Sequence, residues 1–139
     1  MTLAIVTTTT TATAIDHLLN AIRAGAGVPD HLFTPDAELD ATVPNWRFSR
    51  RGAAALARQY REWFTHAAAF EELERHPFDG GEVVTYLLVW RSGGIAYAAH
   101  HCHVLRVDGN GRIAADRFFC GGRWSAALLA EMTAAGDAG

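Results

Sequence analysis

The second half of the chain alternates between strand-like segments and glycine-rich turns, and this pattern constrains the fold more than any other feature. Residues 82–91, 95–107 and 112–120 show the two-residue period of strands. Ser-Gly-Gly and Asp-Gly-Asn-Gly, which are typical of hairpin turns, separate these segments. A Glu-rich segment at 70–76 precedes them and is expected at a sheet edge. The sequence therefore predicts an antiparallel meander.

Helical patterns come before the meander. An apolar stripe formed by Ile15, Leu18, Leu19 and Ile22 predicts a first helix, with Thr13 as its N-cap. The remaining expected elements are a short helix at 28–33, a strand at 38–43, a loop or irregular edge strand at 45–48, a helix at 52–66 with Leu56, Tyr60, Trp63 and Phe64 on its buried side, and a last short helix capped by Ser125. Helices followed by an antiparallel meander predict an α+β fold.

Length and composition limit the class of protein. The chain has 139 residues and a formal net charge of −3, which favours a single globular domain and argues against nucleic acid as a partner. We expect a flexible arm over residues 1–13 and one domain over residues 14–135. The arm resembles neither a signal peptide nor a membrane span, so we expect a cytoplasmic protein without a membrane partner. Cys102 and Cys120 are too far apart in the sequence for a CxxC motif and are expected to be reduced.

Two histidines lie on the apolar face of the segment 95–107. Because side chains on a strand alternate between faces, His101 and His103 share a face with Leu105, whereas His100 points the other way. If Gly109-Asn110 is a two-residue hairpin loop, His103 lies directly opposite Asp116. A three-residue loop or a bulge would shift the alternation and separate the two side chains. The sequence thus predicts a buried imidazole–carboxylate pair that depends on this register.

The preceding hairpin supplies apolar walls for the pair. With Gly93-Gly94 as its loop, Tyr86 lies opposite His101 and Val84 lies opposite His103. The walls around the pair would be Val84, Tyr86, Leu88, Trp90 and Phe118. Such a pocket suits a small apolar or aromatic molecule that a few polar groups hold in place.

A histidine beside a carboxylate in a dry pocket can remove a proton next to a carbonyl group. The alternative is a buried pair that only completes the core. A metal site formed by His101, His103 and Asp116 is a further alternative, but no fourth ligand is evident, so we expect no metal and no other cofactor. Asp40 can project into the pocket or onto the surface, and Trp46 can cover the pocket mouth. The candidate catalytic residues are His103, Asp116 and Asp40, and the candidate substrate-binding residues are His101, Tyr86, Leu88, Trp90, Phe118, Trp46 and Trp63.

The order of elements, the helix "G…ALARQYREWF" and the ending "HVLRVDGNGRIAADRFF" resemble the SnoaL-like and ketosteroid-isomerase-like branch of the nuclear-transport-factor-2-like superfamily. The resemblance covers residues 15–124 and implies a cone-shaped, curved antiparallel sheet around a pocket. It also implies a homodimer formed through the other face of the sheet.

The resemblance assigns family roles to single positions. His103 matches the buried oxyanion-hole Asp of ketosteroid isomerases, whose chemistry is well described. Ala41, next to Asp40, stands in the place of the isomerase base, and His17 or Leu18 in that of its Tyr donor. Phe118 stands in the place of the last-strand Asp of limonene-epoxide-hydrolase-like enzymes. Asp116 matches the acid/base Asp of SnoaL-like cyclases in location, with His103 as its partner.

The expected function is that of a cofactor-independent cyclase, isomerase or dehydratase acting on a small aromatic or polyketide-like carbonyl compound. In this hypothesis His103 is the base, Asp116 orients it, and Tyr86 or His101 stabilises a developing oxyanion. The rival hypothesis is a non-catalytic module of the same fold that binds a small molecule or dimerises.

Overall fold

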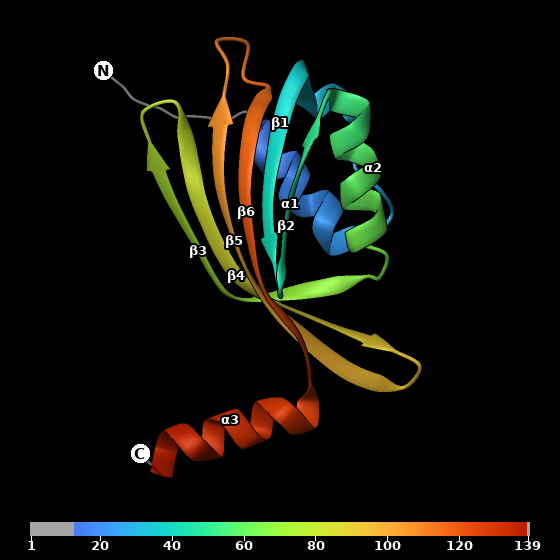
Figure 1. The fold of residues 1–139 in the computed structure, drawn as a ribbon, viewed down its shortest axis with the longest axis vertical. Coiled ribbons are helices and arrows are strands. Elements are labelled where there is room, and N and C mark those ends of the chain that lie inside the picture. The colour runs from blue at the N-terminus through green and yellow to red at the C-terminus, as the bar shows by residue number, and fades with distance from the viewer. Residues whose placement is uncertain (1–12, 139) are drawn as a thin grey trace, which may run out of the picture.

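Two helices lie against one face of a curved six-stranded sheet (Figure 1). The computed structural model describes residues 13–138, so the predicted arm lies, apart from Thr13, outside the described residues. In chain order the elements are α1 (Ala14–Ala24), η2 (Asp30–Leu32), β1 (Phe33–Val43), β2 (Trp46–Arg51), α2 (Ala53–Trp63), β3 (Ala68–Phe78), β4 (Gly81–Ser92), β5 (Ile95–Val107), β6 (Ile113–Ser125) and α3 (Ala126–Ala138). The α+β prediction, including the short C-terminal helix, is confirmed.

The strands lie in the order β2-β1-β6-β5-β4-β3. The predicted antiparallel meander runs from β3 to β6, and β1 pairs with β2 as a separate hairpin. β1 and β6 run parallel, which is the one departure from an antiparallel sheet. This parallel contact is possible because β2, α2 and the meander form a long crossover between the two strands.

The first helix is fixed to the sheet by its apolar stripe and by its charged N-terminus. Thr13 and Asp16 form the predicted capping box, and Ile15, Leu18, Leu19 and Ile22 are buried. Arg75 of β3 pairs with Asp16 at 2.7 Å and also with Glu82 of β4. These contacts join α1 to β3 and β4.

The register of β5 and β6 differs from the prediction, and two differences cancel each other. Asp108 pairs with Arg112 across a three-residue loop, and Ala114 is an extra residue between the pairs Val107–Ile113 and Arg106–Ala115. His103 therefore lies opposite Phe118, and the predicted direct pairing of His103 with Asp116 is wrong. Because the loop and the bulge shift the alternation once each, both side chains still point to the same face.

The register of β4 and β5 is as predicted. Tyr86 lies opposite His101, Val84 lies opposite His103, and Leu88 lies opposite Ala99. These residues belong to the inner face, where Val84, Tyr86, His101 and His103 are all buried.

Several boundaries differ from the predicted ones. β1 begins at Phe33 and β6 continues to Ser125, so both strands are longer than predicted. α2 ends at Trp63, three residues before the predicted end, which releases Thr65 and His66 into a loop. The short helix reduces to the three-residue η2, and residues 46–51 form a regular edge strand.

The outer face of the sheet carries partly buried apolar side chains, namely Val83, Leu87, Val89 and Val104, together with the more exposed Phe119. Association of two copies through this face stays a prediction. Over residues 13–138, no helix has the length and apolar character that crossing a membrane would require.

Candidate active site

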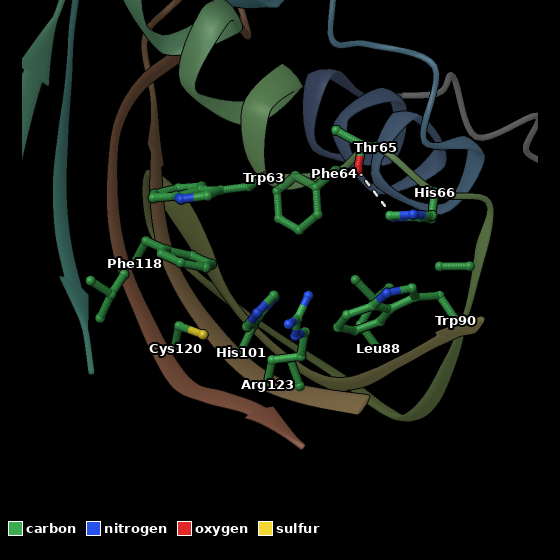
Figure 2. Close-up of a pocket in the computed structure, with 13 residues that line it drawn as sticks. Trp63, Phe64, Thr65, His66, Leu88, Trp90, His101, Phe118, Cys120 and Arg123 are labelled. Carbon is green, nitrogen blue, oxygen red and sulfur yellow. Dashed lines mark hydrogen bonds between the residues drawn. The ribbon is translucent and has the colours of Figure 1, made fainter. Parts of the chain in front are cut away.

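A cavity of about 220 Å³ lies between the end of α2 and the inner face of the sheet (Figure 2). Its lining is mainly apolar and aromatic and consists of Val43, Trp63, Phe64, Thr65, His66, Ala68, Leu88, Trp90, Ala99, His101, Phe118, Cys120 and Arg123. Trp63 stacks on Phe118 with 4.6 Å between ring centroids. These two rings form one wall of the cavity, and Leu88 and Trp90 lie across from it (Figure 2). The volume is below the usual range for drug-sized ligands and suits a compound with one or two rings.

His101 is the most buried titratable residue that lines this cavity. β5 points it inward, and the rings of Phe64 and Phe118 contact it edge-on at centroid distances of 5.8 Å and 4.9 Å. Burial is the main cause that lowers the pKa of His101 to about 3, and the neighbouring His103 and His100 add to it. The imidazole is therefore neutral at physiological pH.

His101 is the outer end of a chain of hydrogen bonds that continues into the core. Its Nδ1 lies 3.1 Å from the hydroxyl of Tyr86, and that hydroxyl lies 2.8 Å from Nε2 of His103. On the other side of the His103 ring, Nδ1 lies 2.8 Å from Oδ2 of Asp116. The hydroxyl of Tyr60, from α2, also contacts Oδ2 of Asp116. Five side chains from α2, β4, β5 and β6 thus connect the cavity with a buried carboxylate.

The inner members of this chain have no access to the cavity. His103 and Tyr86 are 0% exposed and Asp116 is 1% exposed, and none of the three lines the cavity. The predicted contact between the imidazole of His103 and the carboxyl group of Asp116 is present, although the two residues are diagonal rather than directly opposed on their strands. The geometry separates the buried pair of His103 and Asp116 from His101, whose residue lines the cavity.

The two tyrosine hydroxyls and the carboxylate constrain the direction of the bonds in this chain. Burial first, and the charge of Asp116 second, raise the pKa values of Tyr60 and Tyr86 well above their ordinary value, so both keep their protons. Oδ2 of Asp116 accepts the Tyr60 O–H and, with the ring proton of His103 on Nδ1, also the His103 Nδ1–H. In this tautomer His103 accepts the Tyr86 O–H at Nε2. The Tyr86 oxygen in turn accepts the His101 Nδ1–H.

This polarity leaves a lone pair on Nε2 of His101. Among residues 13–138, the only fully buried side-chain nitrogen or oxygen without a hydrogen-bond partner is Oδ1 of Asp116. His101 Nε2 also has no partner, so it retains accessible surface, and its residue lines the cavity. The site therefore presents a neutral base to a ligand and keeps an incompletely paired carboxylate at the far end of the chain.

The mouth of the cavity is formed partly by the loop after α2. Thr65 Oγ1 and His66 Nδ1 lie 3.0 Å apart there (Figure 2). The loop rests on Gly25, which has a φ of 65° and whose missing Cβ would lie 2.2 Å from the carbonyl oxygen of His66. Only glycine fits this position, because a side chain would be strained and would displace the loop.

The cavity also contains a thiol. Cys120 lies opposite His101 on β6, and burial raises the pKa of its thiol. A protonated thiol is a poor nucleophile, so we assign Cys120 to the wall rather than to the chemistry. Cys120 and Cys102 are both free, as expected from the sequence.

Five of the predicted substrate-binding residues, namely Trp63, Leu88, Trp90, His101 and Phe118, line the cavity. Tyr86 lies behind His101 and contacts it instead of the cavity. Asp40 lies outside the cavity, on the face of β1 opposite to the buried Leu39 and Ala41, and forms an ion pair with Arg47 at 2.7 Å. Trp46 is 69% exposed on β2 and does not line the cavity. The structure therefore brings neither Asp40 nor Trp46 to the candidate site.

Sequence reasoning missed Tyr60 as a partner of Asp116, and it missed Phe64, His66 and Arg123 as lining residues. Arg123 lies beyond the predicted end of the last strand, and His66 lies within the predicted helix.

A metal centre at the histidines would require converging ligands. No group of three or more His, Cys, Asp or Glu side chains in the described part of the chain is arranged to hold a metal ion. Both ring nitrogens of His103 are instead occupied by hydrogen bonds to Tyr86 and Asp116.

The fold is similar to that of several solved structures. An NTF2-like protein from Burkholderia xenovorans superposes with a TM-score of 0.59 at 15% identity, over 85% of this chain and 91% of that protein. The epoxide hydrolase/cyclase-like enzyme SalBIII, described in pyran ring formation in the polyether salinomycin, gives a TM-score of 0.58 at 15% identity, over 78% and 88%. A steroid delta-isomerase from Pseudomonas aeruginosa gives 0.52 at 19% identity, over 78% and 77%.

No family model and no curated protein sequence matches the chain. The similarity to solved structures therefore rests on the fold, which is the nuclear-transport-factor-2-like fold suggested by the sequence. At these identities the comparisons support the fold only. The chemistry has to be argued from the residues of the site.

Proposed function

We propose that this protein is a cofactor-independent acid/base enzyme, of the isomerase, cyclase or dehydratase type, that acts on a small aromatic or cyclic carbonyl compound. The single observation that carries this proposal is the polarised chain from His101 to Asp116, which ends in a free imidazole nitrogen at an apolar cavity. The epoxide hydrolase/cyclase-like, epoxide hydrolase and isomerase proteins among the structural neighbours are consistent with such chemistry.

The sequence-based hypothesis gave proton abstraction to His103. Because His103 has no exposed surface, we now assign contact with the substrate to His101 and treat His103 as a member of the relay behind it. His101 is then the catalytic base. Tyr86, His103 and Asp116 act through it.

Proton abstraction proceeds by a balanced relay in this proposal. The substrate proton goes to Nε2 of His101, and the electron pair of the broken C–H bond stays on the substrate as an enolate. The Nδ1 proton of His101 passes to the oxygen of Tyr86, and the hydroxyl proton of Tyr86 passes to Nε2 of His103. The positive charge then lies on His103 beside Asp116, and reversal of the steps returns a proton to the substrate.

The relay explains how a histidine with so low a pKa can serve as a base. A cation held on His101 would be costly, because burial of the imidazole penalises its charged form. A cation on His103 instead pairs with the buried carboxylate at 2.8 Å. The basicity of His101 toward the substrate therefore depends on all the groups of the hydrogen-bonded chain.

Hydrogen–deuterium exchange at carbon tests this function. Small aromatic and cyclic ketones are first selected by their quenching of the fluorescence of Trp63 and Trp90, which line the cavity. For a compound that binds, we expect the protein to accelerate exchange of the protons next to its carbonyl in heavy water, as followed by proton NMR. Binding without any acceleration, across the selected compounds, would contradict catalysis and favour the rival hypothesis of a binding module.

A further inference from the structure

The cavity holds one permanent positive charge, that of Arg123. This residue lies on β6 opposite Ala99, and both residues line the cavity. Its guanidinium lies beside His101 and points into the space below Trp63 and Phe64 (Figure 2). Arg123 is an exposed residue, so its guanidinium is accessible to solvent and to a ligand in the cavity, whereas the rest of the lining suits a neutral apolar ligand.

The protein itself does not neutralise this charge. The cavity lining contains no Asp or Glu. Within residues 13–138, no carboxylate forms an ion pair with Arg123, whereas Arg47 and Arg75 on other strands have carboxylate partners. Nor does the Arg123 side chain donate a hydrogen bond to any other described residue. Its donors are therefore available to a ligand.

The guanidinium is held in place by a contact that leaves these donors free. The guanidinium carbon lies over the ring of Tyr97, 4.6 Å from the ring centroid. A contact with an aromatic face takes up none of the N–H groups in a hydrogen bond, and these groups can form paired hydrogen bonds with carboxylates. Arg123 can therefore offer paired donors to a carboxylate.

We infer that the natural ligand is an anion, namely a small aromatic or cyclic carbonyl compound that carries a carboxylate. Its carboxylate binds Arg123, and its ring lies against Trp63, Phe64 and Phe118. Its acidic C–H bond faces Nε2 of His101, which places the carbonyl group close to the carboxylate. This inference rests on the proposed function and adds the substrate class to it.

A matched pair of ligands separates charge recognition from apolar binding. Naphthalene carboxylate and naphthalene carboxamide have nearly the same shape and differ in charge. We expect wild-type protein to bind the carboxylate about 2- to 5-fold more tightly than the amide in titration calorimetry at neutral pH, as an ion pair at an exposed arginine implies. In Arg123→Gln this ratio should fall to about 1, through loss of carboxylate affinity alone.

The control is Arg117→Gln. Arg117 is exposed like Arg123 and lies on the same strand, but it pairs with Val104 of the outer face and does not line the cavity, so this variant should keep the wild-type preference. Equal affinity of wild-type protein for the two compounds, an unchanged ratio in Arg123→Gln, or no binding of either compound would each overturn the inference.

This experiment measures binding, whereas the proposed function is tested by proton exchange. Failure of the anion-site inference can therefore be told apart from failure of the proposed function. A His101→Gln variant should lose exchange activity and still prefer the carboxylate. A preference for the carboxylate without exchange activity in wild-type protein would leave the anion site standing and remove the catalytic role.

Discussion

Replacing His101 with Gln should lower turnover by about 10²- to 10⁴-fold, the contribution expected of a positioned general base. Glutamine fills similar space and its amide can still donate to the Tyr86 oxygen, but it offers no basic nitrogen to the cavity. The rate of proton exchange on a bound ketone measures this effect. Binding of the ketone should change much less than turnover, because the aromatic walls remain.

The matched control for this variant is His100→Gln. His100 is the adjacent residue on β5, is exposed, and points to the outer face of the sheet. Its replacement should leave turnover close to that of the wild type. Comparable losses in both variants, or full activity in His101→Gln, would contradict the assignment of His101 as the base.

Replacing Asp116 with Ala should lower the free energy of unfolding by about 3–5 kcal/mol, the range seen when one partner of a buried pair is removed. The change leaves the Tyr60 hydroxyl and the His103 Nδ1–H without their shared acceptor, in a site where Asp116 is 1% exposed. Asp116→Asn keeps the shape and an acceptor oxygen, so its loss should be smaller. Urea denaturation followed by tryptophan fluorescence measures both variants.

Asp40→Ala is the matched surface control, and it also tests an earlier candidate for catalysis. The ion pair of Asp40 with Arg47 is solvent-exposed, with 35% and 70% of the two side chains accessible. Exposed pairs contribute about 0–1 kcal/mol, so this variant should be nearly as stable as the wild type and should keep its activity. An Asp116→Ala variant that is as stable as Asp40→Ala would show that the buried chain is not formed.

The sequence predicted the layers of the fold better than the register that builds the site. Periodicity predicted α1 and the meander correctly, because the apolar stripe of a helix and the alternation of a strand are local patterns. The His103–Asp116 contact was expected from a two-residue loop that does not exist. It survives because the longer loop and the extra residue Ala114 offset each other. Nothing in the local sequence specifies that compensation.

Arg123 shows why the rest of the site was beyond prediction. Simple alternation from Phe118 and Cys120 points Arg123 to the outer face. The register of β6 shifts by one residue between Cys120 and Arg123, next to Gly122 with a φ of 110°, and this shift turns Arg123 inward. Two adjacent glycines within a strand are a signal for such a bulge, although they do not say which way the following residue turns. The positions of Tyr60 and His66 at the site depend on how α2 packs on the sheet. This packing is a tertiary property that local sequence patterns do not show.

The tautomer of His101 tests the central claim most directly. Nitrogen-15 NMR of the histidine rings distinguishes protonated from unprotonated nitrogens, and single His→Gln variants assign the signals of the seven histidines. The account predicts that in the free protein at neutral pH the proton of His101 lies on Nδ1, with Nε2 unprotonated, and that His103 also carries its proton on Nδ1. A proton on Nε2 of His101 would mean that the chain runs in the opposite direction, with no base facing the cavity, and would contradict the account.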